Sequence, residues 1–207
     1  MENIVNFIKS FKNIFIYLIL LSIFSFYIKE EAAVLLIITV ILVLINSDLF
    51  KNKDADFKKN FKKYLLLIIK YWLIGAALMY ISNTIINSFT HTIAENEVVN
   101  RESLNNDLVN SLSSMIVIAP LCEEIMFRGS FKNSLKNKYI FCLFTAFLFG
   151  LTHVIFSDDI IYIIPYALFG YYLAKLYYET DNIYNSIIMH MWHNLVCIII
   201  ILLGAVL

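Results

Sequence analysis

Two glutamates and an arginine stand close together inside an apolar stretch of this 207-residue chain, Pro120-Leu121-Cys122-Glu123-Glu124-Ile125-Met126-Phe127-Arg128. A charge at the centre of a membrane helix costs about 3 kcal/mol, so such charges face a bundle interior or a wet cavity and mark functional sites. Glu124 and Arg128 are four residues apart and would pair on one helix face. Glu123 points about 100° away around the helix, which leaves its carboxylate without that partner as a candidate general base.

Polar side chains in two later apolar runs could complete a catalytic site. His153 lies deep in one run, and His190 and Asn194, four residues apart, would share a face of a helix in the last run. A carboxylate with imidazole and carboxamide groups can activate water and stabilise an oxyanion. Each group also has a plain structural explanation, because a histidine can be a satisfied core residue and polar side chains can join membrane helices.

The expected depth of these groups favours a shared site. Counting ~1.5 Å per residue from the cytoplasmic helix ends places Glu123, His153 and Asn194 roughly 20 Å deep, with His190 one turn shallower. Three helices could therefore bring their polar groups into one layer. This estimate requires the fourth helix to continue to about Lys136, because a helix that ended at Arg128 would leave Glu123 too shallow.

The composition indicates which elements must position these residues. Hydrophobic residues make up 60% of the chain and the mean hydropathy is +0.76, far above the ~45–50% apolar content of soluble domains. We therefore predict an all-α, polytopic membrane helical bundle, with residues 1–207 forming a single integral membrane domain. Seven apolar runs predict about seven transmembrane helices: Phe11–Tyr27, Ala32–Ser47, Tyr64–Phe89, Leu108–Phe127, Tyr139–Phe156, Ile160–Tyr178 and Ile183–Leu207.

Charged loops predict the orientation and the environment of the bundle. The segment Lys51–Lys63 carries six lysines, whereas Thr92–Asp107 is acidic. The positive-inside rule then predicts a cytoplasmic N-terminus for a multi-pass protein of the cell (plasma) membrane. The formal net charge of zero gives no sign of a nucleic-acid partner, and the apolar composition leads us to expect the lipid bilayer as a partner. The sequence leaves the oligomeric state open.

Three motifs in order, Glu-Glu-x-x-x-Arg, Phe-x-x-x-His and His-x-x-x-Asn, resemble the CAAX protease and bacteriocin-processing (CPBP, or Abi) family. This is a family of intramembrane glutamate endopeptidases related to the prenyl-protein CAAX endopeptidases. The resemblance covers residues 111–196, which we expect to form the catalytic core, and it does not extend to the first hundred residues. The matching positions are Glu123, Glu124, Arg128, Phe149, His153, His190 and Asn194.

The resemblance implies an intramembrane endopeptidase that needs no cofactor. Glu123 would activate a water molecule assisted by His153, while His190 and Asn194 would form the oxyanion hole. Glu124, Arg128 and Phe149 are then expected to be supporting residues. The substrate would be a membrane-associated protein or peptide, in CAAX-type processing, in maturation of a bacteriocin or pheromone peptide, or in self-immunity.

Several alternatives stay open at this point. A zinc ion could bind Glu123, His153 and His190, although the resemblance points to a metal-independent site. The chain could instead be a non-enzymatic membrane immunity or adaptor protein of the same fold, or a small proton-coupled transporter with a Glu–His relay. His193, about 60° from His190 on the same helix, is expected to face lipid or the protein core rather than the site.

Overall fold

Helices account for nearly all of the chain. The computed structural model describes residues 2–28, 30–155, 157 and 159–204, and no β-strand forms within them. Helices are favoured because lipid offers no hydrogen bonds to the backbone, so each segment must satisfy its own N–H and C=O groups. The α-helices are α1 (Glu2–Ser10), α2 (Lys12–Tyr27), α3 (Glu31–Ile45), α4 (Lys53–Lys59), α5 (Phe61–Thr90), α6 (Glu95–Asn106), α7 (Leu108–Ser113), α8 (Ala119–Glu123), α9 (Lys138–Val154), α10 (Ile163–Thr180) and α11 (Ile183–Leu202).

The helix lengths confirm the predicted membrane bundle but not the predicted number of spans. A sixth candidate span would join α3 to the segment Ser47–Lys59 across a bend of 73°. Helix α9 is apolar but has 17 residues, the lower limit for a ~30 Å hydrocarbon core. The expected count of seven is therefore not confirmed. The five segments that are long and apolar enough by themselves are Ile4–Tyr27, Phe61–Thr90, Leu108–Gly129, Ile160–Thr180 and Ile183–Leu202.

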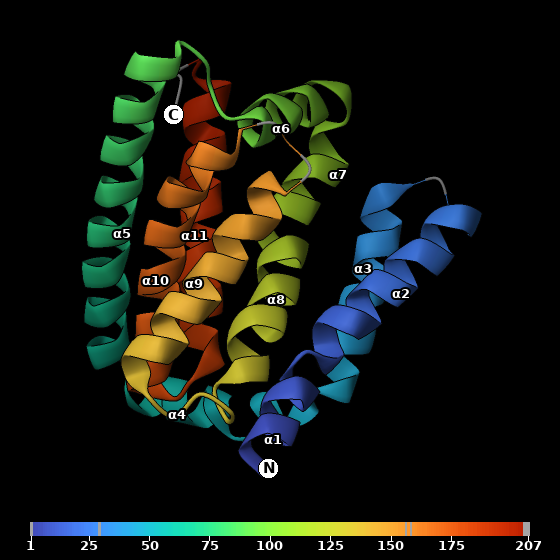
Figure 1. Cartoon of the computed structure of the whole chain (residues 1–207), viewed down its shortest axis with the longest axis vertical. Helices are drawn as coiled ribbons and strands as arrows, with labels where there is room; N and C mark the ends of the chain where they lie inside the picture. Colours follow the sequence, from blue (N-terminus) through green and yellow to red (C-terminus); the bar gives the residue numbers. More distant parts are fainter. Residues whose placement is uncertain (1, 29, 156, 158, 205–207) are drawn as a thin grey trace.

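Helix α10 lies at the centre of the bundle. It packs against α9, α5 and α11, and 50% of its most apolar window is buried, compared with 17% for α5. Helices α2 and α3 form a hairpin beside α8, while α6 lies across one end of the bundle and α4 across the other (Figure 1). Helix α5 thus faces largely toward lipid, while α10 is buried. This arrangement positions the motifs carried by α9 and α11.

Helices α7 and α8 belong to one longer helix that carries both glutamates and the arginine. This α7–α8 helix runs from Leu108 to Phe131, so the expected end near Lys136 is wrong. The carbonyl of Phe131 accepts the N–H groups of Ser134 and Leu135, because the polar residues that follow favour a turn over another helical turn. The α7–α8 helix contains two π-helical turns, Ser114–Ile118 and Glu124–Gly129.

Gly150 allows α9 and α10 to approach closely. A Cβ atom at this position would lie 2.8 Å from the carbonyl oxygen of Ile163 and 3.1 Å from the backbone nitrogen of Ala167. Both neighbours are backbone atoms of the opposing segment and cannot rotate away. The close contact between α9 and α10 therefore requires a residue without a side chain at position 150. This contact places His153 next to α10.

Gly150→Ala is expected to destabilise the protein by about 1–3 kcal/mol, because the added methyl group must push two helices apart. Thermal unfolding of the purified protein in detergent measures the effect. Gly75→Ala is the matched control, since its Cβ would come no closer than 3.2 Å to any atom of α10, with Phe169 Cδ2 at 3.2 Å and Tyr172 Cβ at 3.3 Å. An equal loss of stability in both variants would contradict the close approach of α9 and α10.

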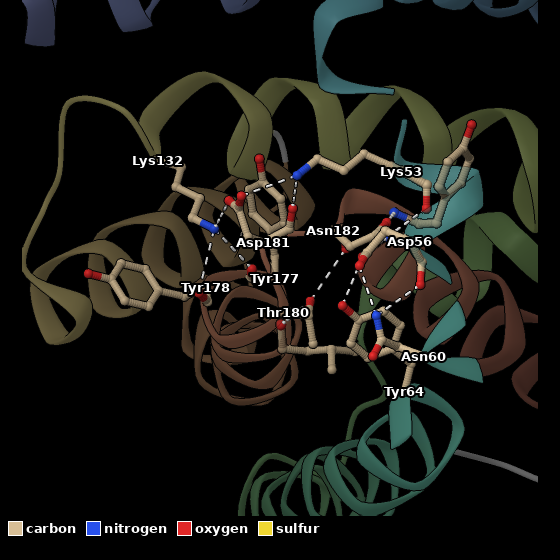
Figure 2. A network of polar contacts seen from close by, with 12 residues as sticks. Lys53, Asp56, Asn60, Tyr64, Lys132, Tyr177, Tyr178, Thr180, Asp181 and Asn182 are labelled. Atoms are coloured by element: carbon tan, nitrogen blue, oxygen red, sulfur yellow. Dashed lines mark hydrogen bonds and ion pairs between the residues drawn. The ribbon is translucent and has the colours of Figure 1, made fainter. Parts of the chain in front are cut away.

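A polar network closes the end of the bundle at which α4 lies (Figure 2). Asp181, in the left-handed region with φ 51°, joins α10 to α11, and its carboxylate accepts hydrogen bonds from Lys132 and Lys53. Asn182 donates to Asp56 Oδ2 at 2.8 Å. Partial burial acts to raise the pKa of Asp181, but the two lysines outweigh it and hold that pKa below its usual range. The network attaches the α10–α11 turn to α4 and to the segment after the α7–α8 helix.

Candidate active site

The first π-helical turn leaves one carbonyl group of the α7–α8 helix open to another helix. In this turn the N–H of Ala119 bonds to the carbonyl of Ser114, five residues earlier. Pro120 follows and has no N–H, so the carbonyl of Met115 lacks a donor in the same register. Asn194 of α11 supplies it, with Nδ2 donating to Met115 O at 2.8 Å. A carboxamide nitrogen carries two protons, so a second N–H of Asn194 stays available.

Glu124 and Arg128 form a fully buried ion pair that also binds His190. Arg128 Nη1 donates to Glu124 Oε1 at 3.0 Å, and both side chains have no exposed surface. His190 Nδ1 contacts the same oxygen at 3.1 Å. Arg128 donates in addition to the carbonyl of Gly170 at 3.1 Å and lies 4.6 Å from the ring centre of Phe149. The pair therefore connects the α7–α8 helix to α9, α10 and α11.

Glu123 lies outside this ion pair. Its side chain is 23% exposed, and Oε2 is buried without a hydrogen-bond partner in the structure. The nearest imidazole nitrogen is His190 Nε2, 3.8 Å from Glu123 Oε2. A carboxylate only accepts hydrogen bonds, so His190 must carry its proton on Nδ1 to bond Glu124, and in the neutral ring Nε2 is an acceptor. Two adjacent glutamates thus have different surroundings.

His153 is held from two sides by α9 and α10. Its Nδ1 donates to the carbonyl of Phe149 at 2.8 Å, since a carbonyl can only accept, and Nε2 is left as an acceptor. The imidazole stacks on the ring of Tyr166, with centroids 4.4 Å apart and planes 22° from parallel. Tyr166 in turn accepts a hydrogen bond from Asn96 of α6 at 3.1 Å. The ring plane of His153 is therefore fixed by packing as well as by its backbone contact.

These side chains meet at one cavity of about 200 Å³. Glu123, His153, His190 and Asn194 all line it, although they come from α8, α9 and α11. Helices α5 and α6, which lie outside the predicted core, complete the wall. Their lining residues are Met79 and Asn83 from α5, and Asn96, Glu97 and Asn100 from α6.

His193 is buried in the protein core, which was one of its two expected positions, but it also lines the cavity, which was not expected. Its ring stacks on Phe169 with centroids 3.8 Å apart. The cavity is also lined by Tyr166, Asn83 and Asn96, which were not predicted as site residues from the sequence. Their residue types carry no motif, and only the packing of α5, α6 and α10 against the site brings them into it.

The described residues hold no group of three or more His, Cys, Asp or Glu side chains placed to bind a metal ion. The two imidazoles closest to Glu123 both use Nδ1 as a donor to protein atoms, His153 to a carbonyl and His190 to Glu124. Both imidazole rings are thus oriented by hydrogen bonds from Nδ1 to other groups of the protein.

Fold and cavity together define a class: an integral membrane helical bundle in which a carboxylate, imidazoles and carboxamides meet inside the apolar region. Within this class, residues 105–196 match the family described as type II CAAX prenyl endopeptidase Rce1-like. The match confirms the resemblance to the CAAX protease and bacteriocin-processing family, which is a protease family. It covers α7 to α11 up to Val196 and contains every motif position.

Three relatives extend the similarity beyond that segment. An uncharacterised protein of Mycoplasma capricolum is 24% identical over 178 residues, which cover 79% of this chain and 53% of that protein. Two proteins of Lactococcus lactis, UPF0177 protein YxdF and UPF0177 protein YbdI, are each 26% identical and cover 63% and 70% of this chain. The alignments span 89% and 81% of those two proteins. No solved structure matches the chain significantly.

Proposed function

We propose that this protein is an intramembrane endopeptidase that hydrolyses a peptide bond of a membrane-associated protein or peptide with a water molecule activated by Glu123. The observation that carries the proposal is the unpartnered Glu123 Oε2 in a cavity shared with His153, His190 and Asn194. Its neighbour Glu124 also has an unpartnered Oε2, but Glu124 Oε1 accepts hydrogen bonds from Arg128 and His190, which hold Glu124 in a fully buried ion pair. Glu124 is held by its counterion Arg128, whereas Glu123 forms no such ion pair among the described residues and its side chain is 23% exposed, as a general base that must reach water requires.

In the proposed reaction, Glu123 and His153 orient the attacking water. Glu123 Oε2 accepts one of its protons, and His153 Nε2, an acceptor in the ring tautomer that Phe149 imposes, holds the other. Loss of the first proton to Glu123 gives a hydroxide that attacks the peptide carbonyl carbon. The stack on Tyr166 limits rotation of the imidazole, which keeps Nε2 aimed at a single position.

The oxyanion formed by this attack needs donors, and Asn194 and His190 can supply them. Asn194 has one N–H beyond the bond to Met115. His190 donates through Nε2 once the proton taken by Glu123 has passed to that nitrogen, either through one bridging water or after the 3.8 Å separation closes to hydrogen-bond distance. When the tetrahedral intermediate collapses, the C–N bond breaks and this proton leaves with the amine. Removing one such donor typically lowers the rate by about 10²–10³-fold, so substitution of either residue should slow hydrolysis.

The proposal extends to the surroundings of the site. We propose that Glu123 activates the water without a metal, and chelator-washed protein should then keep its activity. We also propose a plasma-membrane location with a cytoplasmic N-terminus, as the lysine-rich segment Lys51–Lys63 favours. The substrate class includes CAAX-type proteins and bacteriocin or pheromone peptides.

The function is tested by comparing peptides from membranes that carry the wild-type protein with those from membranes that carry Glu123→Ala at equal abundance. Mass spectrometry is expected to find fragments that occur only with the wild type, and their uncleaved precursors should accumulate with the variant. Identical peptide profiles in the two membranes would refute the proposed protease activity.

A further inference from the structure

Asn83 of α5 is a buried polar residue whose hydrogen bonding is incomplete. The residue is 9% exposed, and its Oδ1 atom has no hydrogen-bond partner in the structure. It lies within the apolar segment Phe61–Thr90, which is long enough to span a membrane. Polar groups in such segments face a bundle interior or a wet cavity, and a buried unpaired carboxamide oxygen calls for a partner. The fold therefore keeps Asn83 at a cost that a ligand would remove.

The position of Asn83 joins two neighbouring spaces. It lines the active-site cavity, which also contains Glu123, His153, His190 and Asn194. It also lines an apolar groove of about 330 Å³ between α5 and α11. We call this the α5–α11 groove; its residues include Trp72, Ala76, Tyr80, Val196 and Ile200. A molecule that extends from the cavity into the groove must pass Asn83.

The lining of the cavity selects the chemistry of that molecule. Four carboxamides line it, from Asn83, Asn96, Asn100 and Asn194, together with the carboxylates of Glu97 and Glu123. Within the described part of the chain, no lysine or arginine lines this cavity. Carboxamides offer the same donors and acceptor as a peptide bond. An anionic lipid headgroup would meet the carboxylate of Glu123 and no lysine or arginine among the described lining residues, and Arg101 is already paired with Glu97.

We propose that Asn83 is a substrate-binding residue: its carboxamide hydrogen-bonds the main chain of the peptide in the active-site cavity, and an apolar side chain of that peptide enters the α5–α11 groove. The groove is the natural place for that side chain because it adjoins the cavity and shares the lining residues Met79, Asn83, His193 and Cys197 with it. This inference rests on the proposed protease function but concerns substrate binding, and it adds a residue outside the matched segment 105–196.

Binding is measured separately from cleavage to test this proposal. Glu123→Gln protein in nanodiscs is mixed with a library of synthetic ten-residue peptides rich in apolar side chains, and binding is read as a rise in unfolding temperature. Adding Asn83→Leu is expected to weaken the affinity of bound peptides by about 3–10-fold, the effect of one lost neutral hydrogen bond. Methylating the contacted backbone N–H of the peptide should weaken binding to Asn83-containing protein and not further to the Asn83→Leu protein.

Ser82→Ala is the matched control. Ser82 is the preceding residue on α5, and its hydroxyl donates to the carbonyls of Leu78 and Met79 in its own helix, so peptide affinity should stay unchanged. Without peptide, Asn83→Leu should leave the unfolding temperature unchanged or raise it, because an unpaired buried group is removed. A marked fall in that temperature would show a structural role and overturn the proposal.

The remaining outcomes separate this inference from the proposed function. Peptides that bind equally well to the Asn83→Leu and Asn83-containing proteins would overturn the role of Asn83 and leave the protease intact. Peptides that bind through Asn83 but are never cleaved by the protein with Glu123 would overturn the protease and keep the peptide site. Stabilisation by phosphatidylethanolamine alone, lost in Asn83→Leu, would identify a lipid as the ligand and refute peptide binding.

Discussion

Glu123→Gln is expected to lower the rate of peptide hydrolysis by about 10²–10⁴-fold, the usual contribution of a positioned general base. The amide keeps the size of the carboxylate but cannot take a proton from water. Because the substrate need not contact Glu123 before water attacks, KM should change little while kcat falls. Initial rates of the purified protein on a substrate recovered from membranes provide the measurement.

Glu102→Gln is the matched control for this loss of rate. Glu102 is exposed on α6 and does not line the active-site cavity, so removing its charge should leave kcat unchanged. The unfolding temperature of Glu123→Gln should stay close to that of the wild type, since no hydrogen bond to Oε2 is lost. Undiminished kcat in Glu123→Gln would remove Glu123 from the reaction.

Glu124→Gln is expected to destabilise the fold by about 3–5 kcal/mol. It would leave the guanidinium of Arg128 fully buried without its counterion, and breaking a buried pair costs this much because one charge stays uncompensated. At 207 residues, such a loss corresponds to a fall in unfolding temperature of roughly 6–20 °C. Differential scanning calorimetry of the purified proteins in the same detergent measures this fall in unfolding temperature.

The double variant Glu124→Gln/Arg128→Met provides the internal control for the pair. Removing both charges should cost less than the sum of the two single substitutions, because neither charge is then left alone in the apolar interior. Strict additivity of the two losses would show that the 3.0 Å contact between Arg128 and Glu124 contributes nothing to stability.

Much of this arrangement follows from local spacing. A separation of four residues puts Glu124 next to Arg128 and Asn194 on the face of His190, whatever the rest of the fold does. Pro120 indicates an irregular helix from the sequence alone, because proline has no backbone N–H to donate. Such signals depend on covalent geometry and helical periodicity alone, so they can be read from the chain.

Contacts between distant helices could not be predicted in the same way. Pro120 indicates a missing donor, but the sequence does not show that a π-helical turn leaves the Met115 carbonyl free or that Asn194 of α11 donates to it. Tyr166 meets His153 because Gly150 lets α9 approach α10. Asn83 lies between two other polar residues, Ser82 and Thr84, and only the packing of α5 brings it to the cavity.

Errors in the sequence interpretation have physical causes as well. The α7–α8 helix ends at Phe131 because a turn satisfies its last carbonyl, yet Glu123 still shares a cavity with His153. The depth estimate assumed a helix that continues to about Lys136, but Glu123 reaches the shared cavity without this additional length. The count of seven spans stays unconfirmed because apolar runs alone cannot distinguish a spanning helix from a bent or short one, such as α3 or α9.

The most direct test of the division between Glu123 and Glu124 is the hydrolysis rate per folded molecule of the two glutamine variants, measured side by side. We expect Glu123→Gln to be fully folded and nearly inactive. Glu124→Gln should be poorly folded, but its folded molecules should hydrolyse substrate within about tenfold of the wild-type rate, because a glutamine oxygen can still accept the His190 Nδ1 proton. Full activity per folded Glu123→Gln molecule, or loss of activity in Glu124→Gln alone, would contradict the assignment of base and ion pair.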